Sequence, residues 1–169
     1  LGCYRFARYR KADRPDVRLV PPDGVDAGEV TRIADAAMLA RDLINTPAND
    51  MGPEELAAAA QALAAEFGAS FACTIGEDLR TQNFPLVHAV GMASDRAPRL
   101  IDISWGDPAH PKVTLVGKGV CFDTGGLDLK PSSGMLIMKK DMGGAANVLA
   151  LARMVMDARL KVRLRVLIP

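Results

Sequence analysis

The chain has 169 residues, of which 49% are hydrophobic, and 21 Lys and Arg residues against 20 Asp and Glu residues leave a net charge of +1. This length suggests one domain with room for a core, and the hydrophobic content excludes an intrinsically disordered chain. A charge so close to zero argues against a dedicated surface for nucleic acid or for anionic membranes, because such surfaces need a clustered basic excess.

The cysteine pattern and the two ends of the chain indicate the cellular compartment and the extent of the protein. Cys3, Cys73 and Cys121 are widely separated and odd in number, which fits neither a disulfide framework nor a zinc finger. No apolar run approaches the roughly 20 residues of a membrane span, and no secretory signal is recognisable, so we expect a soluble, cytoplasmic protein. The sequence starts at Leu1 without Met and stops inside an apolar run, so we expect a piece of a longer protein.

Strand and helix patterns alternate along the chain. Asp26 is placed to cap a long helix whose apolar residues recur at helical spacing and which ends before Thr46, and Pro53 suits the first position of a second helix that Gly68 ends. The expected strands cover 17–20, 70–75, 100–105, 112–116 and 162–169, and a further helix covers 143–157. This alternation predicts an α/β sheet with helices on both faces.

The chemically informative stretch lies between residues 115 and 147, where glycines surround isolated Lys and Asp residues at the ends of a strand and the start of a helix. Open α/β sheets bind ligands at the carboxyl ends of their strands, and glycine allows a close approach of the backbone. The known glycine motifs do not fit. A P-loop fails at Lys112 and Gly119, and a dinucleotide fingerprint that starts at Gly117 fails at Phe122.

A metal site remains possible in this stretch. Asp123 and Asp141 are hard oxygen donors, and Lys118 and Lys130 accompany them. A dication beside a lysine disfavours its ammonium form, so the neutral amine can become a ligand, whereas a lysine that stays charged can stabilise an oxyanion. The alternative is that these residues belong to solvated loops, and that Asp141 only caps the following helix.

Other polar residues have simpler interpretations. Cys121 lies between Val120 and Phe122, so we expect a buried and inert thiol rather than a nucleophile paired with a histidine. His88 and His110 follow no ligand spacing, and we expect packing or surface roles for them. The remaining polar residues are expected to organise the loop after the long helix (Asn45, Thr46 and Asn49) or to be solvated (Lys139 or Lys140).

Three stretches together resemble the leucyl aminopeptidase (cytosol aminopeptidase) family. They are 116–126 (Val-Gly-Lys-Gly-Val-Cys-Phe-Asp-Thr-Gly-Gly), 129–131 with 138–146 (Leu-Lys-Pro, then Met-Lys-Lys-Asp-Met-Gly-Gly-Ala-Ala), and 41–51 (Arg-Asp-Leu-Ile-Asn-Thr-Pro-Ala-Asn-Asp-Met). Tyr4-Arg5-Phe6 is similar to the usual upstream segment. The resemblance covers nearly the whole chain.

The resemblance implies a fold and an assembly. The family's catalytic domain is a three-layer α/β/α sandwich around a mixed, largely parallel sheet, and it follows a smaller α/β domain. On this basis 1–20 is the end of the N-terminal domain with a linker, and 21–169 is the first, incomplete part of the catalytic domain. Family members are typically homohexamers.

The resemblance also implies a reaction, which is the release of N-terminal amino acids, often leucine, from peptides with two divalent metals, zinc or manganese. Carried over by position, Lys118 and Asp141 ligate one metal and Asp123 bridges both. Lys130 is the charged catalytic lysine, and Met138 lines the pocket for the first side chain of the substrate. Lys118, Asp123, Lys130, Met138 and Asp141 together are the expected substrate-binding residues.

One part of the family pattern is missing. The remaining ligands and the arginine that holds bicarbonate lie in an Asn-Thr-Asp-Ala-Glu-Gly-Arg motif, which nothing in 1–169 matches. We therefore expect that these residues alone do not catalyse, while the full-length protein is the enzyme. A competing hypothesis is an assembly or DNA-binding accessory role, against which the near-neutral charge argues.

Overall fold

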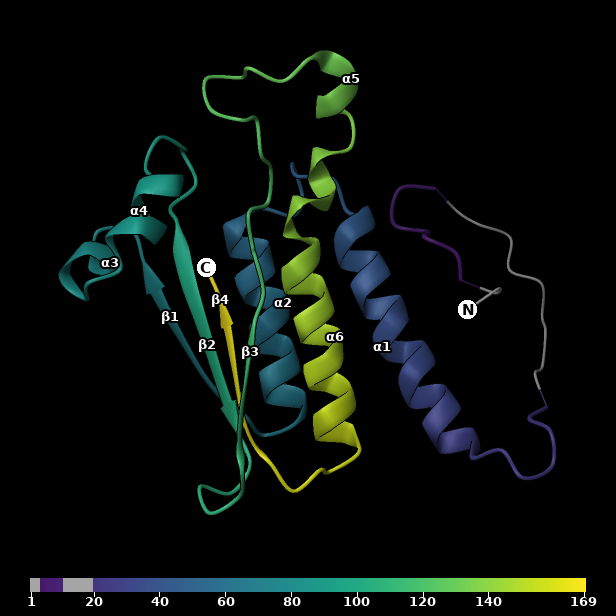
Figure 1. Cartoon of the computed structure of the whole chain (residues 1–169). Coiled ribbons are helices and arrows are strands. Elements are labelled where there is room, and N and C mark those ends of the chain that lie inside the picture. Colours follow the sequence, from purple (N-terminus) through teal and green to yellow (C-terminus); the bar gives the residue numbers. More distant parts are fainter. Residues whose placement is uncertain (1–3, 11–19) are drawn as a thin grey trace.

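The computed structural model describes residues 4–10 and 20–169 (Figure 1). Its helices are α1 (Ala27–Asn45), α2 (Pro53–Glu66), α3 (Asp78–Thr81), α4 (Pro85–Gly91), α5 (Ser132–Met135), the 3₁₀ helix η1 (Met138–Met142) and α6 (Gly143–Asp157). Its strands are β1 (Ser70–Ile75), β2 (Arg99–Trp105), β3 (Lys112–Val116) and β4 (Arg163–Ile168). Of the expected strand at 17–20, only Val20 is among the described residues, and it belongs to no helix or strand.

The four strands form one mixed sheet in the order β1-β2-β4-β3. Strand β2 pairs antiparallel with β1 and with β4, and β3 pairs parallel with β4. The mixed sheet that we expected is confirmed, and one of its three strand pairs is parallel. The connections explain this: α6 carries the chain from the end of β3 back to the start of β4, whereas α3 and α4 stay at one end of β1 and β2 (Figure 1).

Helices lie on both sides of the sheet, as expected for an α/β fold. The long helices α2 and α6 cover one face, with α1 packed against α6, and the short α3 and α4 lie on the other side (Figure 1). Alternate residues of β4 (Leu164, Val166 and Ile168) are buried under α2 and α6 together with Ile101 and Ile103 of β2. The period of two in these strands is what places one side of each against the helices.

The long elements agree with the sequence pattern, and the short helices do not appear in it. The predicted helices and strands between 26 and 169 match α1, α2, α6 and the four strands to within one or two residues. Asp26 caps α1 by accepting a hydrogen bond from the backbone N–H of Gly28 at 2.8 Å. The four helices that the pattern did not predict have seven residues or fewer, too short for a helical period to be recognised.

Candidate metal centre

Lys118 is held at the carboxyl end of the parallel strand pair. The backbone N–H groups of Gly117 and Gly119 donate to Leu167 O (3.0 Å) and Pro169 O (2.9 Å), so the pairing of β3 with β4 continues past Val116. Gly117 has no room for a side chain, because a Cβ there would lie 2.7 Å from Gly144 O. This close approach brings Lys118 to the start of α6.

Asp141 reaches Lys118 from η1. The Lys118 Nζ lies 2.6 Å from Asp141 Oδ2, and the Asp141 side chain is largely buried while that of Lys118 is about half-exposed. Asp141 makes the largest contribution to raising the pKa of Lys118. Helix α6 has no side-chain cap, so the simpler interpretation of Asp141 as a helix cap is wrong.

Asp123 and Lys130 form the second ion pair of the site. The Lys130 Nζ donates to the backbone O of Asp123 and lies 3.0 Å from its Oδ2, while Asp123 Oδ1 accepts from the backbone N–H of Gly125 at 2.9 Å. The Gly125 N–H and the Lys130 ammonium lower the pKa of Asp123 to about 2. Gly125 has a φ of +77°, which favours glycine, so the loop between these two residues is tightly bent.

The two ion pairs share one place in the structure. The charge of Asp123 contributes to the raised pKa of Lys118, and Asp141 is among the neighbours that lower the pKa of Asp123. Residues that are as far apart in sequence as Lys118 and Asp141 thus form a cluster of two cations and two anions at one edge of the sheet. This is the convergence that a metal site requires of them.

Met138 lies on the same short helix as Asp141. It begins η1 and is only 8% exposed. Its role in recognising the first side chain of a substrate stays a prediction, as do the ligand and catalytic roles of the other four residues.

The donor chemistry fits a metal centre in part. Carboxylate oxygens and a neutral amine suit zinc or manganese, and Lys118 is one deprotonation away from donating a lone pair. Among residues 4–10 and 20–169 no group of three or more His, Cys, Asp or Glu side chains is arranged to hold a metal. Two acidic donors are too few for two ions, so further ligands are needed to complete such a centre.

The competing thiol interpretation is not supported. Cys121 is buried, its Sγ donates to Gly119 O, and burial raises the pKa of the thiol to about 11. His88 is buried as well and forms its hydrogen bond with Glu77 (3.0 Å). A nucleophile would need a lowered pKa and an adjacent base.

Two further residues, which the sequence pattern did not single out for a role, donate hydrogen bonds to the loop after α1. Lys139 of η1 donates to Asn45 O at 3.2 Å, and Arg96 donates to the carbonyl oxygens of Ala48 (3.1 Å) and Asn49 (3.0 Å). Thr46 bonds back to Asp42 O at 2.7 Å, in line with its expected role in that loop. A hydrogen bond from a single side chain to a carbonyl oxygen far away in the sequence produces no recognisable sequence pattern.

Known proteins resemble this chain both in sequence and in structure. Residues 38–169 match the catalytic domain of the cytosol aminopeptidase family. The probable cytosol aminopeptidase of Roseiflexus castenholzii is 38% identical over 99% of this chain and 38% of its own length. The crystal structure of the cytosol aminopeptidase from Coxiella burnetii is 55% identical, with a TM-score of 0.94 over 99% of this chain and 36% of that one. The bottromycin maturation enzyme BotP, in complex with Mn, is 38% identical with a TM-score of 0.85 over 99% of this chain and 36% of that one.

An α/β sheet with acidic and lysine side chains gathered at its strand ends is the framework of a metallohydrolase domain. The chain belongs to the cytosol aminopeptidase family, whose members are hydrolases. It spans between a third and two fifths of the length of these relatives. None of the helices in the described part of the chain is long and apolar enough to cross a membrane.

Proposed function

We propose that the complete protein is a metal-dependent aminopeptidase that releases N-terminal amino acids, with leucine preferred, from peptides. The observation that supports this most directly is the convergence of Lys118, Asp123, Lys130 and Asp141 from three separate segments. The family membership supports the same reaction class. The whole protein is further proposed to be cytoplasmic and hexameric.

In this proposal Lys118, Asp123 and Asp141 would be the residues of this chain that hold the divalent ions, zinc or manganese. When bound, such ions polarise the peptide carbonyl and activate water. The ammonium of Lys118 must lose its proton to become a ligand. Its partner Asp141, 2.6 Å away, raises the pKa of Lys118 and favours the ammonium form, so a bound metal ion would have to displace that proton and replace the pairing.

Lys130 is proposed to remain charged and to donate a hydrogen bond to the oxyanion that develops on the scissile carbonyl. Its contacts with Asp123, both at 3.0 Å, hold the ammonium at the edge of the centre before substrate arrives. Met138 is proposed to line the pocket for the first side chain of the substrate, because it is buried on the helix that carries Asp141.

The ligand set is proposed to be completed, together with bicarbonate, by an Asp, a Glu and an Arg that residues 1–169 do not supply, so these residues alone are expected not to catalyse. Residues 1–20 are proposed to end a preceding domain. Assay of the 169-residue chain beside the whole protein on a leucyl peptide tests the first point: equal turnover would overturn it.

The assigned roles are separable by mutation of the whole protein. Lys130→Ala should leave the metal content unchanged and lower kcat by about a hundredfold or more, because one oxyanion donor is lost. Asp123→Ala should release metal, measured by elemental analysis. Lys112→Ala, a lysine at the far end of β3, is the matched control and should change neither. Full turnover in Lys130→Ala would refute the role of this lysine.

A further inference from the structure

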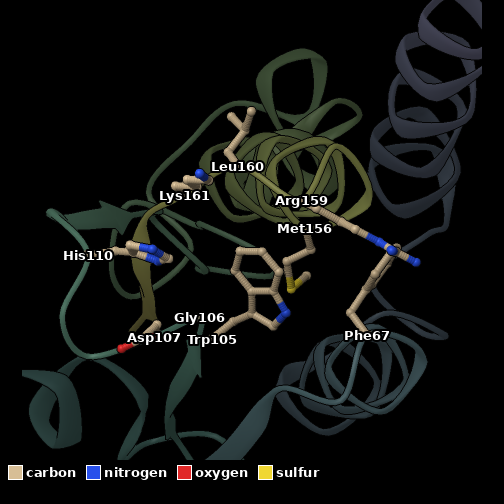
Figure 2. Close-up of a pocket in the computed structure, with 9 residues that line it drawn as sticks. All are labelled: Phe67, Trp105, Gly106, Asp107, His110, Met156, Arg159, Leu160 and Lys161. Atoms are coloured by element: carbon tan, nitrogen blue, oxygen red, sulfur yellow. The ribbon is translucent and has the colours of Figure 1, made fainter.

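Figure 2 shows the residues that line a cavity of about 480 Å³. It lies at the opposite end of the sheet from the candidate metal centre. His110 lines it just before β3 begins, whereas Lys118 follows the last residue of β3. The whole length of that strand therefore separates the two places. The aminopeptidase proposal makes no use of this cavity.

Three large apolar side chains from three parts of the fold line it. Phe67 directly follows α2, Trp105 ends β2 and Met156 lies near the end of α6, and Figure 2 shows the Trp105 ring in the middle of the group. Gly106 has a φ of +91°, and a Cβ there would lie 2.2 Å from Val162 O. The backbone beside the Trp105 ring is thus packed tightly against the segment after α6, which gives a firm aromatic surface.

Basic side chains without partners surround these apolar side chains. Arg159, Lys161 and His110 make no side-chain hydrogen bond or ion pair with any residue that the structure describes. Other arginines near α6 are paired: Arg32 lies 2.7 Å from Asp157, and Arg153 lies 2.6 Å from Glu66. The cavity therefore concentrates cations that nothing in the described chain neutralises.

The charge balance around the cavity strengthens this point. Lys112 and Arg163, opposite each other where β3 and β4 begin, also lack a side-chain partner among the described residues. The acidic lining residue is Asp107, whose Oδ1 accepts the backbone N–H of Ala109 at 2.8 Å. In a chain of net charge +1, this end of the sheet is distinctly positive.

The turn that carries the two cations is well defined. Its backbone N–H groups are bonded, from Arg159 to Met156 O (3.0 Å) and from Leu160 to Val155 O (3.2 Å). Arg159 has a φ of +50°, in the left-handed region where glycine or asparagine is usual after a helix. An arginine in this position is held at the rim of the cavity by the turn.

We propose that this cavity binds a small organic anion with a flat apolar body, an aromatic carboxylate. Trp105 and Phe67 would contact the ring, and aromatic rings stack in offset or edge-to-face arrangements. Arg159 would take the carboxylate through charge-assisted hydrogen bonds, for which the guanidinium fork is well shaped, whereas Lys161 lies on the other side of the Trp105 ring (Figure 2). The ligand would thereby neutralise a cation that has no acidic partner among the described residues.

Trp105 is the only tryptophan of the 169-residue chain, so its fluorescence reports on this cavity alone. Titration with benzoate at about 0.15 M salt, where the Debye length is about 8 Å, should change that fluorescence saturably, with the same affinity by calorimetry. Benzyl alcohol, which keeps the ring without the charge, and acetate, which keeps the charge without the ring, should both bind much more weakly. No saturable change with benzoate, or equal binding of benzyl alcohol, would overturn the proposal.

Two independent variants test the cations, each with its fold checked by circular dichroism. Arg159→Gly suits the positive φ and should weaken benzoate binding about tenfold, since a hydrogen bond to a charged group is lost. Lys161→Gln keeps the length of the side chain and, because Lys161 lies on the other side of the Trp105 ring, should weaken binding only about twofold. Lys112→Gln removes the same charge nearby without lining the cavity, and should cost about twofold or less because salt screens it. If all three variants weakened benzoate binding equally, a general positive field would explain the binding, and the proposed site would be refuted.

Discussion

The contact between Gly117 and the start of α6 gives the sharpest test of how the candidate centre is built. A Cβ on Gly117 would lie 2.5 Å from Val148 Cγ2, 2.7 Å from Gly144 O and 2.8 Å from Ala145 Cα. Two of these atoms belong to the backbone and cannot rotate away. Gly117→Ala must therefore push the segment that carries Lys118 away from the helix.

The cost can be bounded from these contacts. Overpacking of this kind costs about 1–3 kcal/mol. The hydrogen bond from the Ala145 N–H to Lys118 O, now 2.9 Å, would also lengthen or break, at about 1 kcal/mol. A loss of about 2–4 kcal/mol is a large share of the total stability of a domain, about 5–15 kcal/mol. Because Lys118 moves away from Asp141, metal affinity should fall as well.

Urea unfolding followed by circular dichroism measures the first effect, and metal titration of the folded variant measures the second. Gly134→Ala is the matched control, because a Cβ there would meet only Pro131 at 3.9 Å, an ordinary contact. The control should keep the stability and the metal affinity of the wild type. A Gly117→Ala protein as stable as the control would show that the strand–helix contact is looser than these distances require.

Three further changes have expected outcomes. Cys121 has a pKa raised to about 11, so in the native protein at pH 8 it should be alkylated about a hundredfold more slowly than an ordinary thiol, and unfolding should remove this protection. Peptide mapping by mass spectrometry measures the labelling. Rapid labelling of Cys121 in the native protein would contradict its burial. Arg96→Ala loses two hydrogen bonds to backbone carbonyls and should lower the free energy of unfolding by about 1–2 kcal/mol, with Arg10→Ala as control. Asp26→Ala removes the cap of α1 and should cost about 1 kcal/mol, whereas Asp23→Ala should cost little; equal effects would argue against the cap.

The long elements could be predicted because each carries its own periodic signal. The alternating residues of β4 and the apolar stripe of α6 have the same register in the sequence as in the structure. Short helices such as η1 carry no such signal. Strand order also escaped prediction, because it depends on whether the chain between two strands returns along the sheet, as α6 does, or stays at one end.

For the candidate centre, the local pattern around Lys118 and Asp123 indicated the chemistry and the residues, and the resemblance to a family gave them roles. What no local pattern contains is the 2.6 Å approach of Lys118 to Asp141, or the bond from Lys139 to the distant Asn45. Both depend on a helix start packed against a strand end through glycines. The same holds for the basic cavity at Trp105, whose residues come from opposite halves of the chain.

The residue types, the periodic elements and the family could all be inferred from neighbouring positions along the chain. Which charges are neutralised depends instead on how the chain folds: Lys118, Lys130, Arg32 and Arg153 have acidic partners, whereas Arg159 and Lys161 have none among the described residues. Ion pairing depends on distances of a few ångströms between remote segments, and the packing of helices on the sheet sets those distances.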